Sequence, residues 1–465
     1  MIHLFRDLII ILICGLFYYR TLRYGYVSDD IPVAKKQEPK AKNKWWEAWY
    51  ELTSRRNFDN KRIHIIVSTL HLLTCLAIYH AFGANNISFV ASLFFCVNPV
   101  NLYCSVWGAG KGYTIGTLMA IMMFIFPYFS PLFFYVGLTQ SNNLLFAPLL
   151  FLLTKNPYMA FVILMAIPRI KEIFSITHNK FTQETNKELL TVHHRKLIPY
   201  LKTFGYYFIL CLVPHKIALY HDFLYNFGVD TEANKESYRI DKHFWIGLGL
   251  FILCIASYFY PNYYIKFGLF WFLINISMWS NAITMQQQIA QRYCYIANVG
   301  LMLALSSFIL SFPHPIPIII FFSILVFYST RLWWLTPSLY NEFWNVEYNI
   351  IEAKNLHYAW LAKGVHKFGD HNLPEAHLCL MRAKELRPKD FKTNFNLSQV
   401  LLLLGRVDEA LKNFEYTMKE CTINGREDMI KEITEIVKPA YEEIAKQVKE
   451  KGTAQIDMNK IKLIL

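Results

Sequence analysis

The stretch Tyr293–Phe312 reads YCYIANVGLMLALSSFILSF and carries no charged residue over its 20 positions. A helix of about 20 apolar residues is long enough to cross the roughly 30 Å hydrocarbon core of a bilayer. In lipid, only helices and closed barrels satisfy all backbone hydrogen bonds, and the strict alternation typical of barrel strands is absent here. This stretch therefore predicts a helical membrane protein.

Similar apolar runs lie on both sides of this stretch. Several are too short for a perpendicular span, so we expect some half-helices or re-entrant segments. The run after Arg6 has no small-residue cleavage site behind it, which favours an uncleaved first span over a signal peptide. The twelve candidate runs are Leu8–Tyr19, Ile63–Phe82, Ile87–Val97, Tyr113–Phe126, Ser130–Leu138, Leu144–Leu153, Tyr158–Ile170, Tyr200–Val213, Phe244–Tyr260, Ile265–Trp279, Tyr293–Phe312 and Ile316–Tyr328.

Composition agrees with this class. Hydrophobic residues make up 54% of the 465 residues and charged residues 17%, against about 25% charged in soluble proteins, which excludes a purely soluble enzyme. The net charge of +13 belongs to residues 1–339, since residues 340–465 hold 19 basic and 19 acidic side chains. Because the basic residues lie between apolar runs, phosphate-bearing lipid is the expected partner and nucleic acid is not. The nine cysteines lie mostly in apolar runs and predict no disulfide framework.

A charge-balanced tail follows the membrane part, and it contains a repeat. We place the membrane domain at residues 1–335, the repeat domain at 350–450 and a short tail at 451–465. A predicted helix at Glu427–Lys449, with Ile430, Ile433 and Ile436 on its apolar side, caps the array. The array is either a stable helical appendage or, as we prefer, a groove that holds a peptide or protein partner. Trp360, Gly364, Ala376, Leu380, Ala383 and Pro388 fit a 34-residue tetratricopeptide unit, and Ala410, Phe414 and Thr417 recur 34 residues after three of them.

Two adjacent acids, Asp29 and Asp30, follow the first apolar run in the loop of residues 20–62. Serine and aspartate favour turns and helix caps, which is the simpler interpretation of Ser28-Asp29-Asp30. A neighbouring like charge and partial desolvation would instead raise the pKa of one carboxyl toward a value useful for a general base. In that case Asp29 or Asp30 faces a substrate and the other supports it.

Cations and aromatic residues gather in the same loop and near two later apolar runs. Five lysines in Lys35–Lys44 precede Trp45–Tyr50, which predicts a helix lying on the membrane surface. Arg55 and Arg56 follow, and such residues either meet anionic lipid or form a phosphate site. Lys111 ends the glycine-rich stretch Gly108–Lys111, which does not match the P-loop pattern. Arg292 directly precedes a predicted span, where its side chain either snorkels toward the membrane surface or binds an anion.

No zinc site is predicted. His64 and His71 are seven residues apart, so on a helix they share a face at about 10 Å along the axis, too far to bind one metal ion. HxxxH and HExxH patterns are absent from the sequence.

These residues together resemble, in chain order, the transmembrane glycosyltransferases that carry tetratricopeptide repeats, which are related to protein O-mannosyltransferases and have the type C glycosyltransferase membrane fold. The resemblance runs from residue 25 to about residue 420. The chain departs from the family where Asn98, Tyr113 and Gln291 replace the ionisable His, Asp and Glu, and where Lys111 replaces Arg. The donor sugar or acceptor can therefore differ, or activity can be lost. The matching blocks are Gly25–Asp30 (paired acids), His64 with His71, Asn98-Pro99-Val100 with Trp107 and Gly110-Lys111, and Gln291–Tyr295 with Val299-Gly300.

The resemblance implies transfer of a mannose-like sugar from a polyprenyl phosphate to a hydroxyl, usually Ser or Thr of a protein, by an inverting displacement on the extracytoplasmic or lumenal side. It implies Asp29 as base and Asp30 as orienting residue, because a hydroxyl nucleophile needs a positioned base. The phosphate leaving group needs cations. We assign these to Lys111 and Arg292 first, then to Arg55 and Arg56, with His64, His71, Asn98, Trp107 and Tyr293 lining the site. No cofactor and no catalytic metal are implied.

Topology and alternatives follow from the same resemblance. The acid loop and the repeats are both outside in the family, which requires an odd number of spans, about eleven if two short runs between Ser130 and Leu153 act as one. The 11 Lys and Arg residues of Arg20–Arg62 conflict with that orientation under the positive-inside rule. The expected location is a bacterial inner membrane or the endoplasmic reticulum. The alternatives are a transferase acting on lipid or polysaccharide, and a non-catalytic membrane scaffold or transporter, for which a continuous polar path would argue.

Overall fold

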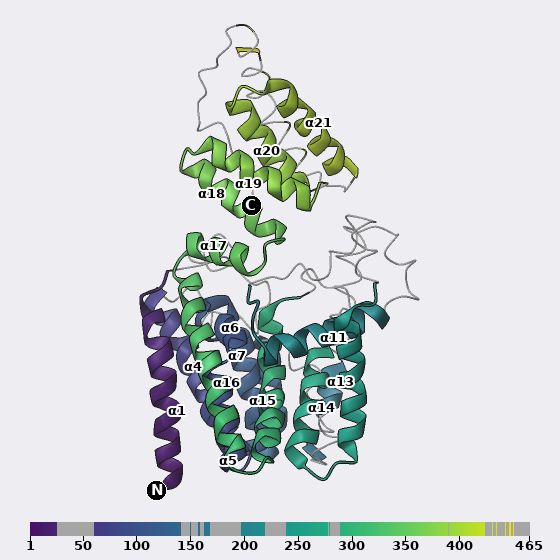
Figure 1. Cartoon of the computed structure of the whole chain (residues 1–465). Helices are drawn as coiled ribbons and strands as arrows, with labels where there is room; N and C mark the ends of the chain where they lie inside the picture. Colours follow the sequence, from purple (N-terminus) through teal and green to yellow (C-terminus); the bar gives the residue numbers. More distant parts are fainter. Residues whose placement is uncertain are drawn as a thin grey trace. The chain divides into compact units, whose positions relative to one another are not determined.

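The computed structural model of the chain describes residues 1–25, 60–140, 197–218, 239–277, 289–388 and 390–423, with single positions or short pieces at 149, 157–158, 162–167, 279, 430, 434, 442, 446–447 and 450. Within these residues all regular structure is helical (Figure 1), which confirms the all-α prediction. The chain forms two compact units, and among the described residues the first ends at Asn345. This division falls inside α17 (Glu342–Glu352).

The first unit is a bundle of apolar helices. The predicted runs Leu144–Leu153 and Tyr158–Ile170 lie wholly or partly outside the described residues, and each of the other ten runs corresponds to a helix. The helices are α1 (Ile2–Tyr18), α4 (Asn60–Ala81), α5 (Asn86–Val97), α6 (Leu102–Val106), α7 (Lys111–Ile125), α8 (Ser130–Gln140), α11 (Leu197–Leu212), α13 (Lys242–Tyr258), α14 (Tyr263–Ser277), α15 (Cys294–Leu310) and α16 (Ile316–Leu335). Short 3-10 turns are η1 (Tyr19–Arg23), η3 (Pro99–Asn101), η4 (Gly108–Gly110), η5 (Pro127–Phe129), η10 (Gln291–Tyr293) and η11 (Thr336–Leu339).

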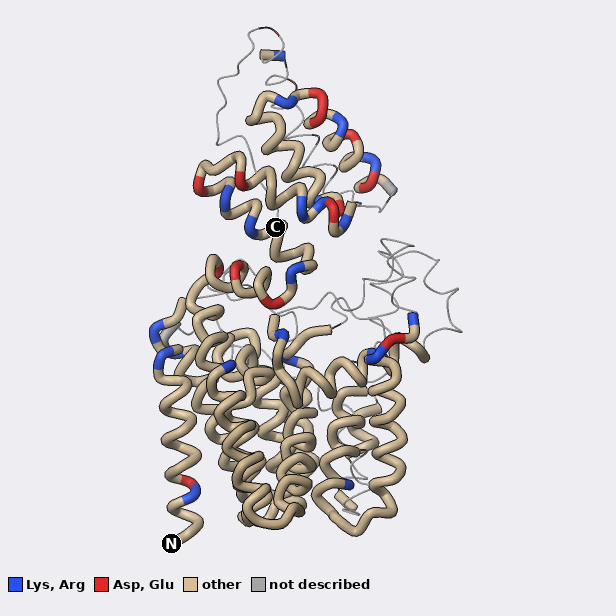
Figure 2. The backbone as a smooth tube through the Cα atoms, viewed as in Figure 1, with Lys and Arg blue, Asp and Glu red and all other residues tan. Residues whose placement is uncertain are grey.

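Four of these segments are long and apolar enough to cross a membrane: Ile2–Arg23, Arg62–Ala81, Gln291–Leu310 and Ile316–Leu339. A fifth is added if α5 and the segment Pro99–Val106, which meet at a bend of 58°, count as one broken span. Figure 2 shows basic and acidic residues near the ends of the helices and few along their middles. The described residues thus support a membrane protein with four or five full-length spans, fewer than the predicted eleven.

Close backbone contacts hold the interior of this unit together. A Cβ added at Gly268 of α14 would lie 2.2 Å from the carbonyl oxygen of Gly300 on α15. The reverse contact, from Gly300 to the Gly268 carbonyl, would be 2.5 Å. Small residues let helix backbones approach in this way where lipid provides no hydrophobic driving force between helices. Trp271 of α14 also donates its indole N–H to the Ile296 carbonyl at 2.6 Å.

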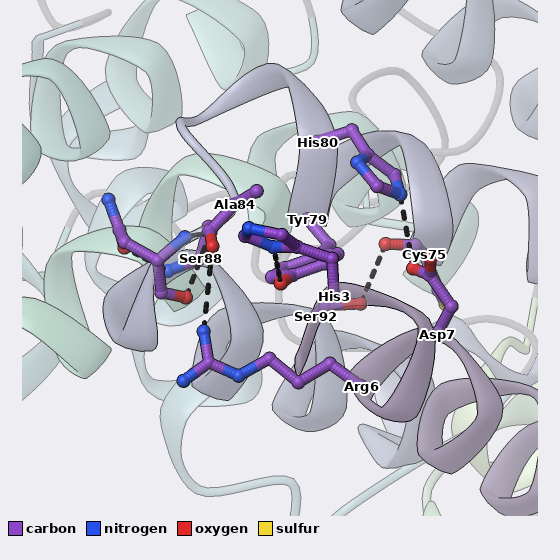
Figure 3. Close-up of polar contacts among 10 residues, drawn as sticks. His3, Arg6, Asp7, Cys75, Tyr79, His80, Ala84, Ser88 and Ser92 are labelled. Carbon is purple, nitrogen blue, oxygen red and sulfur yellow. Dashed lines mark hydrogen bonds and ion pairs between the residues drawn. The ribbon is translucent and has the colours of Figure 1, made fainter. Parts of the chain in front are cut away.

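A polar network fastens the start of α1 to the end of α4 and to the turn that follows it (Figure 3). The same view includes Ser92 of α5, whose hydroxyl donates to the Cys75 carbonyl of α4 at 2.6 Å. The contacts of α1 hold its first turns against the end of α4 and the turn after it, and the Ser92 contact joins α5 to α4. The contacts of α1 are His3 Nδ1 to Tyr79 Oη at 2.8 Å, Arg6 to the Ala84 carbonyl at 3.5 Å and Asp7 Oδ1 to His80 Nε2 at 3.0 Å.

The second unit contains two consecutive helix hairpins, α18 (His357–Gly369) with α19 (Leu373–Leu386), and α20 (Phe391–Leu403) with α21 (Val407–Ile423). Turns of three residues join the helices of each pair. A shared apolar cluster fills the space between the pairs, and Ile430, within the predicted capping helix, packs against it. Asn372 and Asp390 cap the starts of α19 and α20 through their side-chain oxygens.

Candidate functional site

One end of the first unit gathers the end of α1, the start of α4 and the end of α6. The backbone N–H of Gly25 donates to the Tyr340 carbonyl at 2.8 Å. His64, which is 2% exposed, places Nδ1 at 2.8 Å from the Val106 carbonyl and Nε2 at 3.3 Å from the Gly25 carbonyl. The last described residue before the acid pair is therefore held against the α6–α7 connection.

That connection is a tight turn from Trp107 to Lys111. Trp107 has an extended backbone (ψ 130°) that ends α6, and its carbonyl accepts the Gly110 N–H at 2.9 Å. A Cβ at Gly110 would lie 2.3 Å from the Tyr103 carbonyl, so this close approach requires glycine. Lys111 is 7% exposed and begins α7, so its positive charge adds to the N–H groups of a helix N-terminus, which favour anions.

Arg292 is held against the same turn. It lies in η10, is partly buried, and donates from Nε to the hydroxyl of Tyr113 in the first turn of α7 at 3.3 Å. Its guanidinium carbon lies 5.0 Å from the ring centre of Tyr293 and 5.9 Å from that of Trp107. The cation is thus oriented by three aromatic side chains, at distances where cation–π attraction contributes. The structure brings Trp107, Tyr293 and Arg292 together.

An aromatic wall continues from Tyr293. The rings of Trp279 and Tyr293 stack with centroids 3.8 Å apart and an interplanar angle of 7°. Tyr113 lies 6.1 Å from Tyr293 and 6.4 Å from Trp279. Sequence analysis treated Tyr113 only as a departure from a family pattern and Trp279 only as the last residue of an apolar run. Their shared place near Arg292 depends on tertiary packing, which no local sequence signal reveals.

His71 and Asn98 have partners inside the bundle. Nδ1 of the fully buried His71 lies 2.6 Å from the Tyr295 hydroxyl, and Nε2 lies 3.2 Å from the Cys96 carbonyl. Asn98 accepts the Val100 N–H at 3.0 Å and donates to the Cys211 carbonyl at 2.9 Å. These contacts make Asn98 the cap of the break between α5 and η3, which accounts for the residue without a substrate role.

The remaining predicted site residues, Asp29, Asp30, Arg55 and Arg56, lie outside the described residues, as does the predicted surface helix Trp45–Tyr50. Comparison with protein-family models, curated proteins and solved structures finds no match for this chain. The proposal of a function therefore rests on the chemistry of the site itself and on the motif resemblance.

Proposed function

We propose that the protein is a membrane glycosyltransferase of the type C architecture that transfers a mannose-like sugar from a polyprenyl phosphate to a hydroxyl acceptor, in most cases Ser or Thr of a protein. The observation that carries the proposal is the convergence of Arg292, the Lys111 turn and Gly25 at one end of an apolar bundle. Such a site offers cations to a phosphate at the position where a lipid-linked donor leaves the hydrocarbon region.

The cations provide the electrostatic part of the reaction. In an inverting displacement, the bond from the anomeric carbon to the phosphate oxygen breaks while the acceptor oxygen attacks, so negative charge grows on the phosphate. Preorganised cations and N–H dipoles in a water-poor site stabilise that charge without reorganisation. Arg292 is suited to this role because Tyr113 and the Tyr293 ring fix its planar guanidinium.

The acid pair provides the base. Asp29 is the fourth residue after Gly25, so chain length alone keeps its Cα within about 14 Å of the Cα of Gly25. Because His64 and Tyr340 hold Gly25 at the same end of the bundle as Arg292, the carboxylate of Asp29 is within reach of an acceptor placed there. In this proposal Asp29 takes the hydroxyl proton and Asp30 orients it.

We assign the second unit as tetratricopeptide repeats because its recurring positions are buried. Positions that recur at a spacing of 34 residues are buried in both hairpins, as this repeat requires: Ala376 and Ala410 are each 0% exposed. A Cβ at Gly364 would come within 2.7 Å of the Leu380 side chain, in keeping with the small residue that the repeat places at the contact of its two helices. We propose that the repeats form a groove that binds a partner. We also propose that the full molecule has about eleven spans, with the repeats and the acid loop on the extracytoplasmic or lumenal side.

The test compares membranes that carry the wild-type protein or the Asp29→Asn variant, each given labelled mannosyl polyprenyl phosphate. Loss of a general base lowers rates by about 10²–10⁴-fold, so label in the protein fraction should disappear in the variant. The matched control is Asp7→Asn, since Asp7 pairs with His80 at the opposite end of α1 and should leave transfer unchanged.

The fraction that receives the label separates the alternatives. Label in lipid or glycan that depends on Asp29 would move the acceptor class from protein to lipid or polysaccharide. Equal label with Asp29→Asn and wild type would reject Asp29 as the base. No transfer from any of several polyprenyl-linked sugars would reject the enzyme and leave a membrane scaffold or transporter.

A further inference from the structure

A cluster of soft metal ligands lies where α1, α4 and α5 meet, and the proposed reaction does not use it. His71 and Cys75 are four residues apart on α4, so they share one face of the helix. Together with Cys96 near the end of α5, they place three ligand atoms within 4.8 Å of one another. All three side chains are fully buried.

A fourth ligand comes from the first helix. Cys14 on α1 is 3% exposed, and its thiol is the neighbour of Cys96 and His71 from that helix. The Cys75 thiol lies within 4.8 Å of the Cys96 thiol and 3.9 Å from His71 Nε2. Three cysteines and one histidine from three helices thus converge, and the set Cys₃His is one of the common sets of closed structural zinc sites.

We propose that Cys14, His71, Cys75 and Cys96 bind a thiophilic d¹⁰ metal ion, Zn²⁺ or Cu⁺, as a structural site inside the membrane bundle. Thiolate and imidazole ligands select these ions over Mg²⁺ and Ca²⁺, which prefer oxygen. Tetrahedral zinc holds its sulfur ligands about 3.8 Å apart, so His71, Cys75 and Cys96 need to contract by about 1 Å at most, and Cys14, which lies outside this group, has to move closer.

The surroundings of His71 match those of a ligand histidine. Metal-binding imidazoles usually donate their second ring N–H to an oxygen, which fixes the ring orientation. Nδ1 of His71 lies 2.6 Å from the Tyr295 hydroxyl, to which it can donate, so Nε2, the nitrogen nearer Cys75, would exchange its 3.2 Å contact with the Cys96 carbonyl for the metal. The Phe95 ring stacks on the His71 imidazole with ring centroids 5.6 Å apart. The Tyr18 ring packs against it in a T-shaped arrangement at a centroid distance of 5.0 Å, so packing also holds the imidazole in place.

Charge balance limits how many of the three thiols bind as thiolates. Two thiolates neutralise Zn²⁺ and one neutralises Cu⁺, so a neutral site in the apolar interior releases only those thiol protons, and each further thiolate would leave one negative charge. A bound ion would tie α1 and α5 to α4, whose His64 two helical turns away holds Gly25. The inference is independent of the proposed sugar transfer.

The test uses the full chain, purified in detergent through a tag without histidine, and metal analysis by plasma mass spectrometry. We expect about one zinc or copper ion per wild-type chain and background levels in Cys75→Ala and Cys96→Ala. Cys254→Ala is the matched control, because Cys254 is 1% exposed on α13 and outside the cluster, and it should retain the metal. Tyr295→Phe should weaken binding by about 10- to 100-fold by removing the hydrogen bond to His71.

Two wild-type measurements decide the matter even if the cysteine variants do not fold. Stripping the metal with a membrane-permeant chelator should lower Tm, and Zn²⁺ or Cu⁺ should restore it. Replacement by Co²⁺ or Cd²⁺ should give thiolate-to-metal absorption bands, which a surface-bound ion would not give. A wild-type chain at background metal after incubation with each ion, or a disulfide between Cys75 and Cys96 in the purified protein, would overturn the proposal.

Discussion

At the scale of single residues, Arg292 is the side chain whose geometry bears most directly on the proposed reaction. Lysine keeps the charge but loses the planar group that contacts Tyr113 and the Tyr293 ring. We therefore expect Arg292→Lys to lower kcat for the lipid-linked sugar by about 10-fold and Arg292→Gln by about 10²–10³-fold.

The matched control is Arg331→Lys on α16. Arg331 also lies over an aromatic ring, 4.9 Å from the ring centre of Trp334, and donates to the His215 carbonyl, yet it has no role in the proposed reaction. Steady-state kinetics in detergent or nanodiscs measures both variants. If Arg331→Lys and Arg292→Lys lower kcat equally, a loss of stability rather than of phosphate binding is the cause.

Asp390 makes the start of α20 sensitive to acid. Burial raises the pKa of this carboxyl, but hydrogen bonding to His357, the charge of that imidazole and two hydrogen bonds from Thr393 outweigh it and lower the pKa to about 2. Because the pKa is lower in the folded state than the ordinary 3.8, the stabilisation is complete above about pH 4 and is lost as the pH falls toward 2. The effect is worth about 2 kcal/mol.

Asp390→Asn should remove this pH dependence while keeping the helix cap, since asparagine also caps helices well. Hydrogen exchange of residues 391–403, corrected for intrinsic rates between pH 2 and 5, measures the local stability. The exposed residue Asp408 provides the control Asp408→Asn. An unchanged pH profile in Asp390→Asn would show that other acids cause the acid sensitivity.

At the scale of elements, the backbones of α11 and α13 come into contact at two glycines, Gly205 of α11 and Gly247 of α13. A Cβ at Gly247 of α13 would lie 1.9 Å from the Leu201 carbonyl of α11, whereas a Cβ at Gly249, two residues on, meets nothing within 4 Å. Gly247→Ala should therefore force the helices apart and lower Tm, at a cost of about 1–3 kcal/mol. Gly249→Ala on the same helix should be neutral or stabilising. Thermal unfolding in detergent compares the two, and equal effects would mean that the close helix contact is not present in solution.

The positions of the helices could be predicted from sequence because each needs an apolar surface, and ten of the twelve predicted runs correspond to helices. The break between helices at Asn98 was harder to predict from sequence. Its cause is the side-chain cap on Val100 and the bond to the Cys211 carbonyl, a residue 113 positions away. The motif blocks pointed to Trp107, Lys111 and Arg292, whereas Trp279 and the His71–Cys75–Cys96 cluster arise from tertiary packing that periodicity does not encode.

At the scale of the membrane unit, the two ends of the bundle differ in chemistry. Near the N-terminus, Asp7 pairs with His80, and the Tyr264 hydroxyl donates to the Phe82 carbonyl at 3.0 Å. Ser307 donates to Asn262 at 3.0 Å, so the turn after α15 lies at this end as well (Figure 1). The other end holds Gly25, Tyr340 and the turn with Arg292. This separation gives the orientation of the bundle a direct meaning for the proposed function, because only one of the two ends holds the candidate site.

The motif resemblance places the Gly25 end outside, whereas the 11 basic residues of Arg20–Arg62 favour the inside under the charge rule. Labelling with a membrane-impermeant maleimide decides between them. All nine native cysteines are buried, so background labelling should be low. We expect Tyr340→Cys, at a position 47% exposed, to react in sealed right-side-out membranes, and Ser311→Cys, at an exposed position in the turn after α15, to react only after permeabilisation. The reverse pattern would place the candidate site in the cytoplasm and reject lumenal transfer. Labelling of both cysteines from outside would show that the bundle does not span the bilayer between these two ends.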